Sequence, residues 1–174
     1  MDIMKTVAEL MALSAVTAPK AKGQDCIEAK VITDPKILAE LADAMALYSE
    51  EPRKKFFLRD SENIRNSQAL LLLSVKDNKP AGLNCGACGQ PECTMLTVSN
   101  EGPEFPGPLC AWRAIDLGIA IGSAAKTAGM LNADNRVLYS VGVVVKKIGL
   151  MQGAVVVGIP INAAAKNIYF DRTF

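Results

Sequence analysis

The chain contains no histidine among its 174 residues. Without histidine it cannot build mixed cysteine–histidine zinc sites, histidine-based catalytic triads or imidazole acid–base pairs. Any metal or redox chemistry must therefore rest on cysteine, on carboxylates or on a bound cofactor.

Long apolar runs and an excess of one charge are also missing. The longest apolar stretches, residues 69–75 and 154–161, are strand-sized and fall short of the roughly 18–20 residues of a membrane-spanning helix. Basic and acidic residues number 19 and 18, so no global field attracts nucleic acid or an anionic membrane. The N-terminus shows a charged amphipathic pattern rather than a secretory signal. We expect a cytoplasmic protein with neither nucleic acid nor membrane as a partner, folded as one domain over residues 1–174.

Hydrophobic periodicity and capping signals divide the chain into helices and strands. We expect helices over residues 3–16, 35–48, 60–66, 110–129 and 134–148. We expect strands over residues 27–33, 69–75 and 154–158. The best-marked boundary is Asp34 followed by Pro35, an N-cap with proline at the first helical position.

Residues 82–110 differ from the rest of the chain, because glycine, proline and cysteine are frequent there and periodicity is weak. A long irregular segment inside a compact domain usually has a functional reason. We interpret this segment as an inserted metal-binding loop.

Four of the five cysteines follow the spacing C-x2-C-x4-C-x16-C. They are Cys85, Cys88, Cys93 and Cys110. Three thiolates within nine residues suit three corners of an iron–sulfur cubane, and a distant fourth residue closes it. Gly86 and Gly89 permit the backbone to approach such a cluster closely. The pattern predicts one [4Fe–4S] cluster.

Two other interpretations of the cysteines remain open. A four-cysteine zinc site usually pairs two C-x2-C knuckles, and this chain has only one. Free or disulfide-linked cysteines are the other alternative. Cys26 stands apart and is read as a half-buried thiol, with a substrate-facing or regulatory thiol as the alternative. Trp112, close to Cys110, is expected to pack there and shield the cluster.

The cysteine pattern resembles the small iron–sulfur domain of corrinoid proteins and of membrane electron-transport complexes, which binds one [4Fe–4S] cluster. The whole chain resembles a bacterial and archaeal family of uncharacterised ferredoxin-domain proteins. That resemblance rests on residues 18–25, the cysteine loop, and residues 107–110, 115–124, 134–136 and 166–172. It implies cluster binding and leaves the reaction open.

Outside the cysteine loop the chain resembles flavin-dependent nitroreductases, through its opening helix–loop–strand–helix and through residues 116–125 and 158–160. This resemblance implies an α+β fold with a mixed sheet, a homodimer and FMN at the dimer interface. It places three groups of residues on the flavin: Pro19, Lys20 and Lys22 near the ring, Gly122 and Ser123 in the pocket wall, and Lys166 and Arg172 on the phosphate. The Arg-x-Ser-x-Arg pattern of those enzymes is missing here.

Each of these flavin residues also has a plain structural alternative. Lys20 and Lys22 can be solvated loop charges, Gly122 and Ser123 can serve helix packing, and Lys166 and Arg172 can form surface ion pairs worth little. We therefore expect a redox protein whose cluster exchanges electrons with a flavin in a homodimer, as a flavin-dependent oxidoreductase would. The alternatives are an electron carrier or accessory cluster protein without its own active site, and a zinc protein that binds a partner.

Overall fold

The structure, a computed structural model, describes residues 2–99 and 104–170. One four-stranded sheet runs through it in the order β1-β2-β4-β3, and every pairing is antiparallel. The strands are β1 (Ile27–Ile32), β2 (Ala69–Val75), β3 (Asp134–Asn135) and β4 (Val156–Asn162). The α-helices are α1 (Ile3–Thr17), α2 (Pro35–Tyr48), α3 (Phe56–Arg65), α4 (Ala111–Met130) and α5 (Tyr139–Lys147). The expected α+β class is confirmed, although the described sheet is antiparallel rather than mixed.

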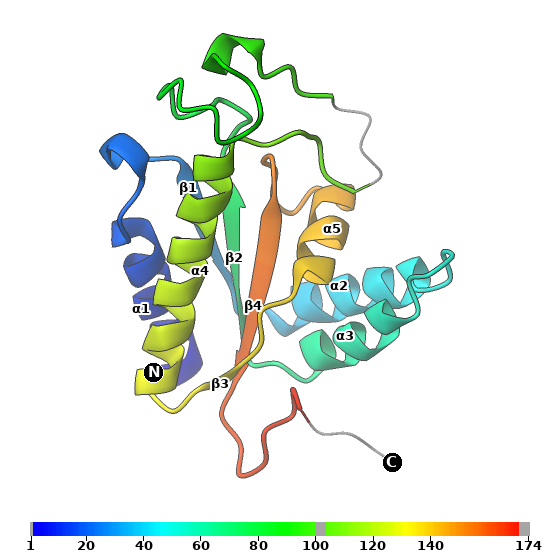
Figure 1. The fold of residues 1–174 in the computed structure, drawn as a ribbon. Coiled ribbons are helices and arrows are strands. Elements are labelled where there is room, and N and C mark those ends of the chain that lie inside the picture. The colour runs from blue at the N-terminus through cyan, green and yellow to red at the C-terminus, as the bar shows by residue number, and fades with distance from the viewer. Residues whose placement is uncertain (1, 100–103, 171–174) are drawn as a thin grey trace.

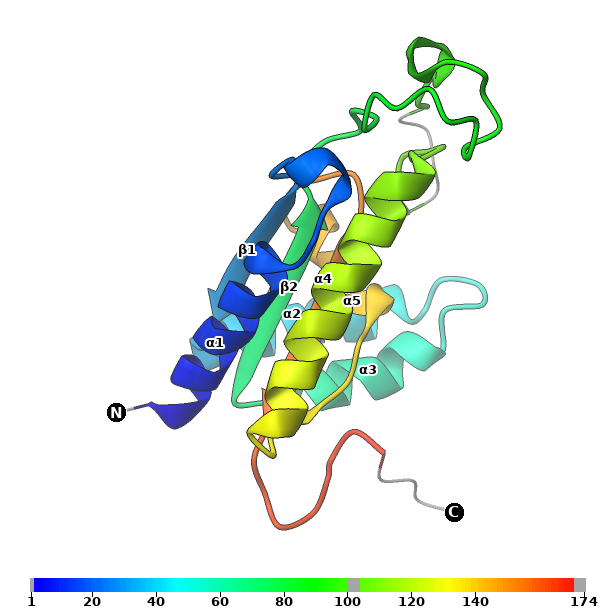
Figure 2. The ribbon, with the colours of Figure 1, turned by 60° about the vertical axis from the view of Figure 1, so that its left-hand side comes forward.

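Helices cover both faces of the sheet. Helices α1 and α4 lie side by side on one face, and α2, α3 and α5 lie on the other (Figures 1 and 2). Each face of the sheet has its own hydrophobic core, and strand β2 contributes to both. Leu71 and Leu73 point to the α1/α4 layer, while Leu70 and Leu72 point to the opposite layer. A central strand buried on both faces reads as a continuous apolar run, which is what residues 69–75 show.

The capping signals hold where the sequence marks them clearly. The side chain of Asp34 accepts a hydrogen bond from the N–H of Lys36 (2.8 Å), with Pro35 at the start of α2.

Helix α3 begins at Phe56, four residues earlier than expected. The reason is tertiary packing, because Phe57 is completely buried and its ring meets Tyr48 edge-on at a centroid distance of 4.8 Å.

Two boundaries near the C-terminus were wrong. Residues 134–135, expected to cap a helix, pair instead with the end of β4, and the helix α5 starts only at Tyr139. Strand β4 runs from Val156 to Asn162, through Pro160 and four residues beyond the expected end at Gly158. The N–H of Gly158 points away from β2 and bonds the carbonyl of Leu138, and Pro160 faces the same side. The ladder with β2 therefore loses no donor at Pro160.

In the part of the chain that the structure describes, no helix is both long and apolar enough to cross a membrane.

Candidate cluster and cofactor site

The cysteine loop connects β2 to α4 at one end of the sheet (Figure 1). Its described residues are irregular apart from the 3-10 turn η2 (Cys93–Met95) and a bridge between Ser99 and Gly107. The later part of the loop, at Glu104, is anchored to the α2/α3 side of the protein. Glu104 accepts hydrogen bonds from Lys54 and from the hydroxyl of Tyr48. The loop thus contacts the body of the protein well away from its cysteines.

All four predicted ligands line one pocket. Cys85, Cys88, Cys93 and Cys110 share its wall with apolar side chains, among them Trp112. The burial is uneven, because Cys110 is buried beneath the loop, Cys88 and Cys93 are half-buried, and Cys85 is exposed. The pocket therefore has a protected side at the start of α4 and an open side at Cys85.

Several N–H groups point at the sulfur atoms. The indole Nε1–H of Trp112 donates to the Sγ of Cys85 at 3.2 Å, and the backbone N–H of Asn84 donates to the Sγ of Cys93 at 3.3 Å. The N–H of Ala87 and then the indole of Trp112 lower the pKa of the Cys85 thiol, because both favour the thiolate. A thiolate is the form that binds metal. Trp112 was expected to shield the cluster, and it remains 38% exposed.

The residues around the pocket fit an iron–sulfur cluster. Gly86 and Gly89 have φ angles of 72° and 85°, so this segment adopts left-handed turns between the first three cysteines. Cys110 is the residue before α4, whose N-terminal end favours negative charge. Among the described residues, no three cysteine or carboxylate side chains converge closely enough to hold a single metal ion. All five cysteines are free thiols.

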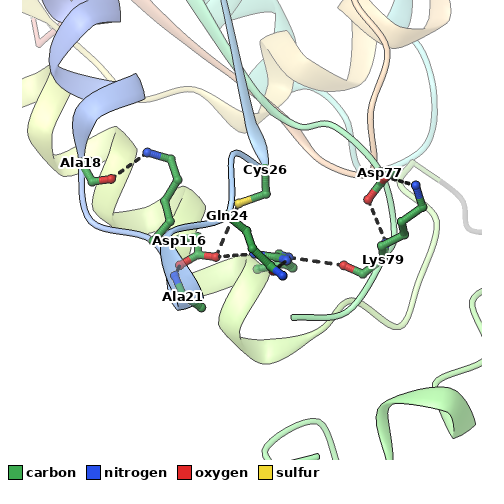
Figure 3. Close-up of polar contacts among 9 residues, drawn as sticks. Ala18, Ala21, Gln24, Cys26, Asp77, Lys79 and Asp116 are labelled. Carbon is green, nitrogen blue, oxygen red and sulfur yellow. Dashed lines mark hydrogen bonds and ion pairs between the residues drawn. The ribbon is translucent and has the colours of Figure 1, made fainter. Parts of the chain in front are cut away.

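One turn along α4 from the pocket lies a buried polar network, centred on Arg113 and Asp116. Their side chains form an ion pair of 3.0 Å and are only 6% and 2% exposed. Asp116 also accepts hydrogen bonds from the N–H of Ala21 (2.8 Å) and from the thiol of Cys26 (3.5 Å). Figure 3 shows the carboxylate between these two groups. Burial raises the pKa of the Cys26 thiol, so this cysteine stays protonated.

The guanidinium of Arg113 connects the network to the cysteine loop. It donates to the carbonyl of Lys79 at 3.3 Å and to the side chain of Gln24. The pair therefore joins α4, the loop after α1 and the beginning of the cysteine loop. Sequence reasoning missed this role. The available signal was an Arg and an Asp three residues apart in the otherwise apolar first half of the helix, which is unusual unless the two are paired inside the protein.

The structure places the flavin candidates in separate parts of the fold. The ammonium of Lys20 donates to the carbonyls of Ala15, Val16 and Ala18, which end α1. The ammonium of Lys22 lies beside Gly82, at the entrance of the cysteine loop. These lysines therefore contact the protein itself in this conformation.

Pro19 and Ser123 do come together, because both line a shallow groove between the end of α1 and the middle of α4. Gly122 is exposed, and nothing lies within 4 Å of a Cβ built on it. Lys166 belongs to the segment after β4, and Arg172 falls outside the described residues.

The two ends of the expected flavin site are far apart within one chain. The loop with Pro19 to Lys22 is tied to Asp116, near the start of α4. The segment with Lys166 is tied to Asp134, just beyond the end of α4, through a 2.8 Å hydrogen bond from Asn167. From Asp116 to the end of α4 at Met130 the helix rises about 21 Å. A single copy does not bring these groups to one small ligand.

Comparison with solved structures defines the fold class. Nitroreductase A from Vibrio parahaemolyticus matches with a TM-score of 0.57 and 14% identity, over 94% of this chain and 60% of that one. A nitroreductase with bound FMN from Desulfitobacterium hafniense matches with a TM-score of 0.60 and 13% identity, over 92% of this chain and 78% of that one. The fold is therefore nitroreductase-like, as expected, and the chain spans about 60% of the length of the first of these relatives.

Comparison of sequences identifies the family. Residues 106–172 match the family described as "uncharacterized protein containing a ferredoxin domain". A protein of Archaeoglobus fulgidus is 44% identical over 170 residues, covering 97% of this chain and 91% of its own length. The chain belongs to this ferredoxin-domain family.

Proposed function

We propose that this protein is a redox protein that binds one [4Fe–4S] cluster through Cys85, Cys88, Cys93 and Cys110. The observation that carries the proposal is that four cysteines, 25 residues apart from first to last, line a single pocket with N–H groups directed at two of the sulfurs. Family membership supports it, since a ferredoxin domain suggests an iron–sulfur cluster. A reducing, cytoplasmic setting would keep these thiols available as ligands.

The chain's own residues have distinct tasks in this proposal. Cys110 holds the buried side of the site and excludes water, while Cys85 and Trp112 form its open side. The Arg113–Asp116 pair fixes the loop after α1 against α4, one turn from Cys110. When bound, the cluster supplies one-electron transfer, which a flavin can convert into a two-electron reduction.

The cluster is tested by spectroscopy of anaerobically purified protein. We expect a broad brown absorption in the visible region, and Cys88→Ser should abolish it. Cys26→Ser is the matched control and should leave the spectrum unchanged, because Cys26 bonds to Asp116 and does not line the pocket. A colourless protein that contains stoichiometric zinc, even after reconstitution with iron and sulfide, would favour the zinc alternative.

We also propose that the electron partner is FMN bound across a homodimer. The support is the fold, which is shared with a nitroreductase whose structure holds FMN, together with the groove that joins Pro19 to Ser123. A second copy is needed because the loop after α1 and the segment after β4 lie about 21 Å apart along α4. In a symmetric dimer the missing end of each site comes from the other chain.

A simple electron carrier without FMN is the second candidate function. The observation that favours it is that Lys20, expected near the flavin ring, directs its ammonium to three carbonyls of its own chain. Titration of the purified protein with FMN, followed by quenching of flavin fluorescence, decides between the two. Absence of quenching at about 100 µM FMN, which would reveal binding stronger than roughly −5.5 kcal/mol, would favour the carrier.

A further inference from the structure

Helix α4 presents an apolar stripe to solvent, here called the α4 stripe and defined as Trp112, Ile115, Gly118, Ile119 and Gly122. At 100° per residue these five positions fall within about 120° of the helix surface. The three large side chains are 38–46% exposed, and nothing lies within 4 Å of a Cβ built on either glycine. In the view of Figure 2, α4 lies at the front of the molecule beside α1, with no further layer drawn over it.

The neighbouring helix widens this apolar face. Helix α1 packs against α4, with the hydroxyls of Ser14 and Thr127 2.6 Å apart, and exposes large apolar residues of its own. Of these, Ile3 and Leu10 lie on the same side of α1 as Ser14, within about 40° of it at 100° per residue. Exposed apolar residues gathered on two neighbouring helices are typical of an interaction site.

The residue composition of the α4 stripe favours a second copy of this chain as its binding partner. None of the five stripe residues is charged, and exposed Lys126 continues the same face of α4 one turn beyond Gly122. The uncharged part of this face can pair with its own image across a twofold axis. Gly118 and Gly122 lack side chains that would hold a facing helix away, so two α4 helices can approach closely. The proposed FMN site requires a second copy for an independent reason, the separation of its two ends along α4.

One end of the stripe touches the cysteine pocket. Trp112 is both the first residue of the stripe and the donor of the 3.2 Å hydrogen bond to Cys85. Cys85 is the exposed ligand, and Leu83 of the same pocket wall is also exposed. A partner seated on the α4 stripe would bury the Trp112 indole and cover the open side of the pocket.

We propose that dimerisation through the α4 stripe encloses the cluster, so that cluster retention depends on assembly. The inference rests on the homodimer of the proposed function and adds a role for it. Cys110 protects the site from within each chain, and the partner copy protects the Cys85 side. A chain separated from its partner then exposes the cluster to solvent at Cys85.

The test measures assembly and iron release together under anaerobic, reducing conditions. Ile119→Glu places a charge in the middle of the stripe and should give a monomer by light scattering. Its cluster should release iron to a colorimetric ferrous chelator several-fold faster than wild type. The control is Leu58→Glu, an equally drastic change at a residue of α3 that is 53% exposed on the other helix layer. It should stay dimeric and release iron at the wild-type rate.

Dilution of the wild-type protein tests the same link without a mutation. Iron release should accelerate as the concentration falls below the dimer dissociation constant, by mass action. Release from Ile119→Glu should not depend on concentration. Trp112 is the only tryptophan of the chain. In cluster-free protein its emission should therefore shift to longer wavelength when the dimer dissociates.

The possible failures are distinguishable. A wild-type protein that is monomeric at every concentration would overturn both this inference and the dimeric flavin site, while the cluster could still bind. A wild-type dimer whose iron release is independent of dilution, or is matched by monomeric Ile119→Glu, would overturn the inference alone. A dimeric Ile119→Glu would show that the α4 stripe is not the interface.

Discussion

Removing the carboxylate of Asp116 should destabilise the protein strongly, although the residue lies in no predicted ligand set. Asp116→Ala leaves the guanidinium of Arg113 buried without its counter-charge, since the two side chains are only 2% and 6% exposed. Breaking a buried pair by removing one partner costs about 3–5 kcal/mol. For a chain of 174 residues, that loss corresponds to a fall in Tm of roughly 6–20 °C.

The assay is thermal and urea unfolding of the cluster-loaded protein under anaerobic conditions, compared with two controls. Asp43→Ala removes a carboxylate whose pair with Arg65 is exposed at the surface, so it should cost at most about 1 kcal/mol. The double variant Arg113→Met with Asp116→Leu buries no lone charge and should cost less than Asp116→Ala alone. A loss below about 1 kcal/mol for Asp116→Ala, equal to that of Asp43→Ala, would refute the buried network.

Three further predictions concern other parts of the chain. In the cluster-loaded protein, burial raises the pKa of the Cys26 thiol, so its alkylation should require a pH above the ordinary thiol pKa of about 8.5. Rapid alkylation of Cys26 at neutral pH, detected by mass spectrometry, would contradict this prediction. If FMN binds, Arg172→Ala should weaken it by about 1.5–3 kcal/mol, or roughly ten- to a hundredfold in Kd by fluorescence titration; an unchanged Kd would place the phosphate elsewhere. Gly142→Ala should prevent normal folding, because its Cβ would lie 1.7 Å from the carbonyl oxygen of Val156; a wild-type Tm would show that α5 and β4 are not packed this closely.

The parts of the fold that could be predicted are those with local signals. The continuous apolar run of β2 and the Asp34–Pro35 helix start need no tertiary information, and both appear as expected. The start of α3 depends on an aromatic cluster, and the path of β4 through Pro160 depends on which side of the strand faces β2. No local pattern could provide them.

The candidate site divides in the same way. Cysteine spacing identifies the four residues that line the pocket, because that spacing is itself the chemical requirement of a cluster. It does not reveal that Trp112 donates to Cys85, nor that Asp116 holds the loop after α1, since both contacts depend on how α4 packs. The residues assigned to flavin through a resemblance stay predictions, and one of them lies outside the described residues.

The central claim is tested most directly by determining iron, acid-labile sulfide and zinc in the protein purified anaerobically. One [4Fe–4S] cluster on the four cysteines predicts about four iron and four sulfide per chain, with both lost in Cys88→Ser. One zinc per chain without sulfide, unchanged after reconstitution with iron, would contradict the account.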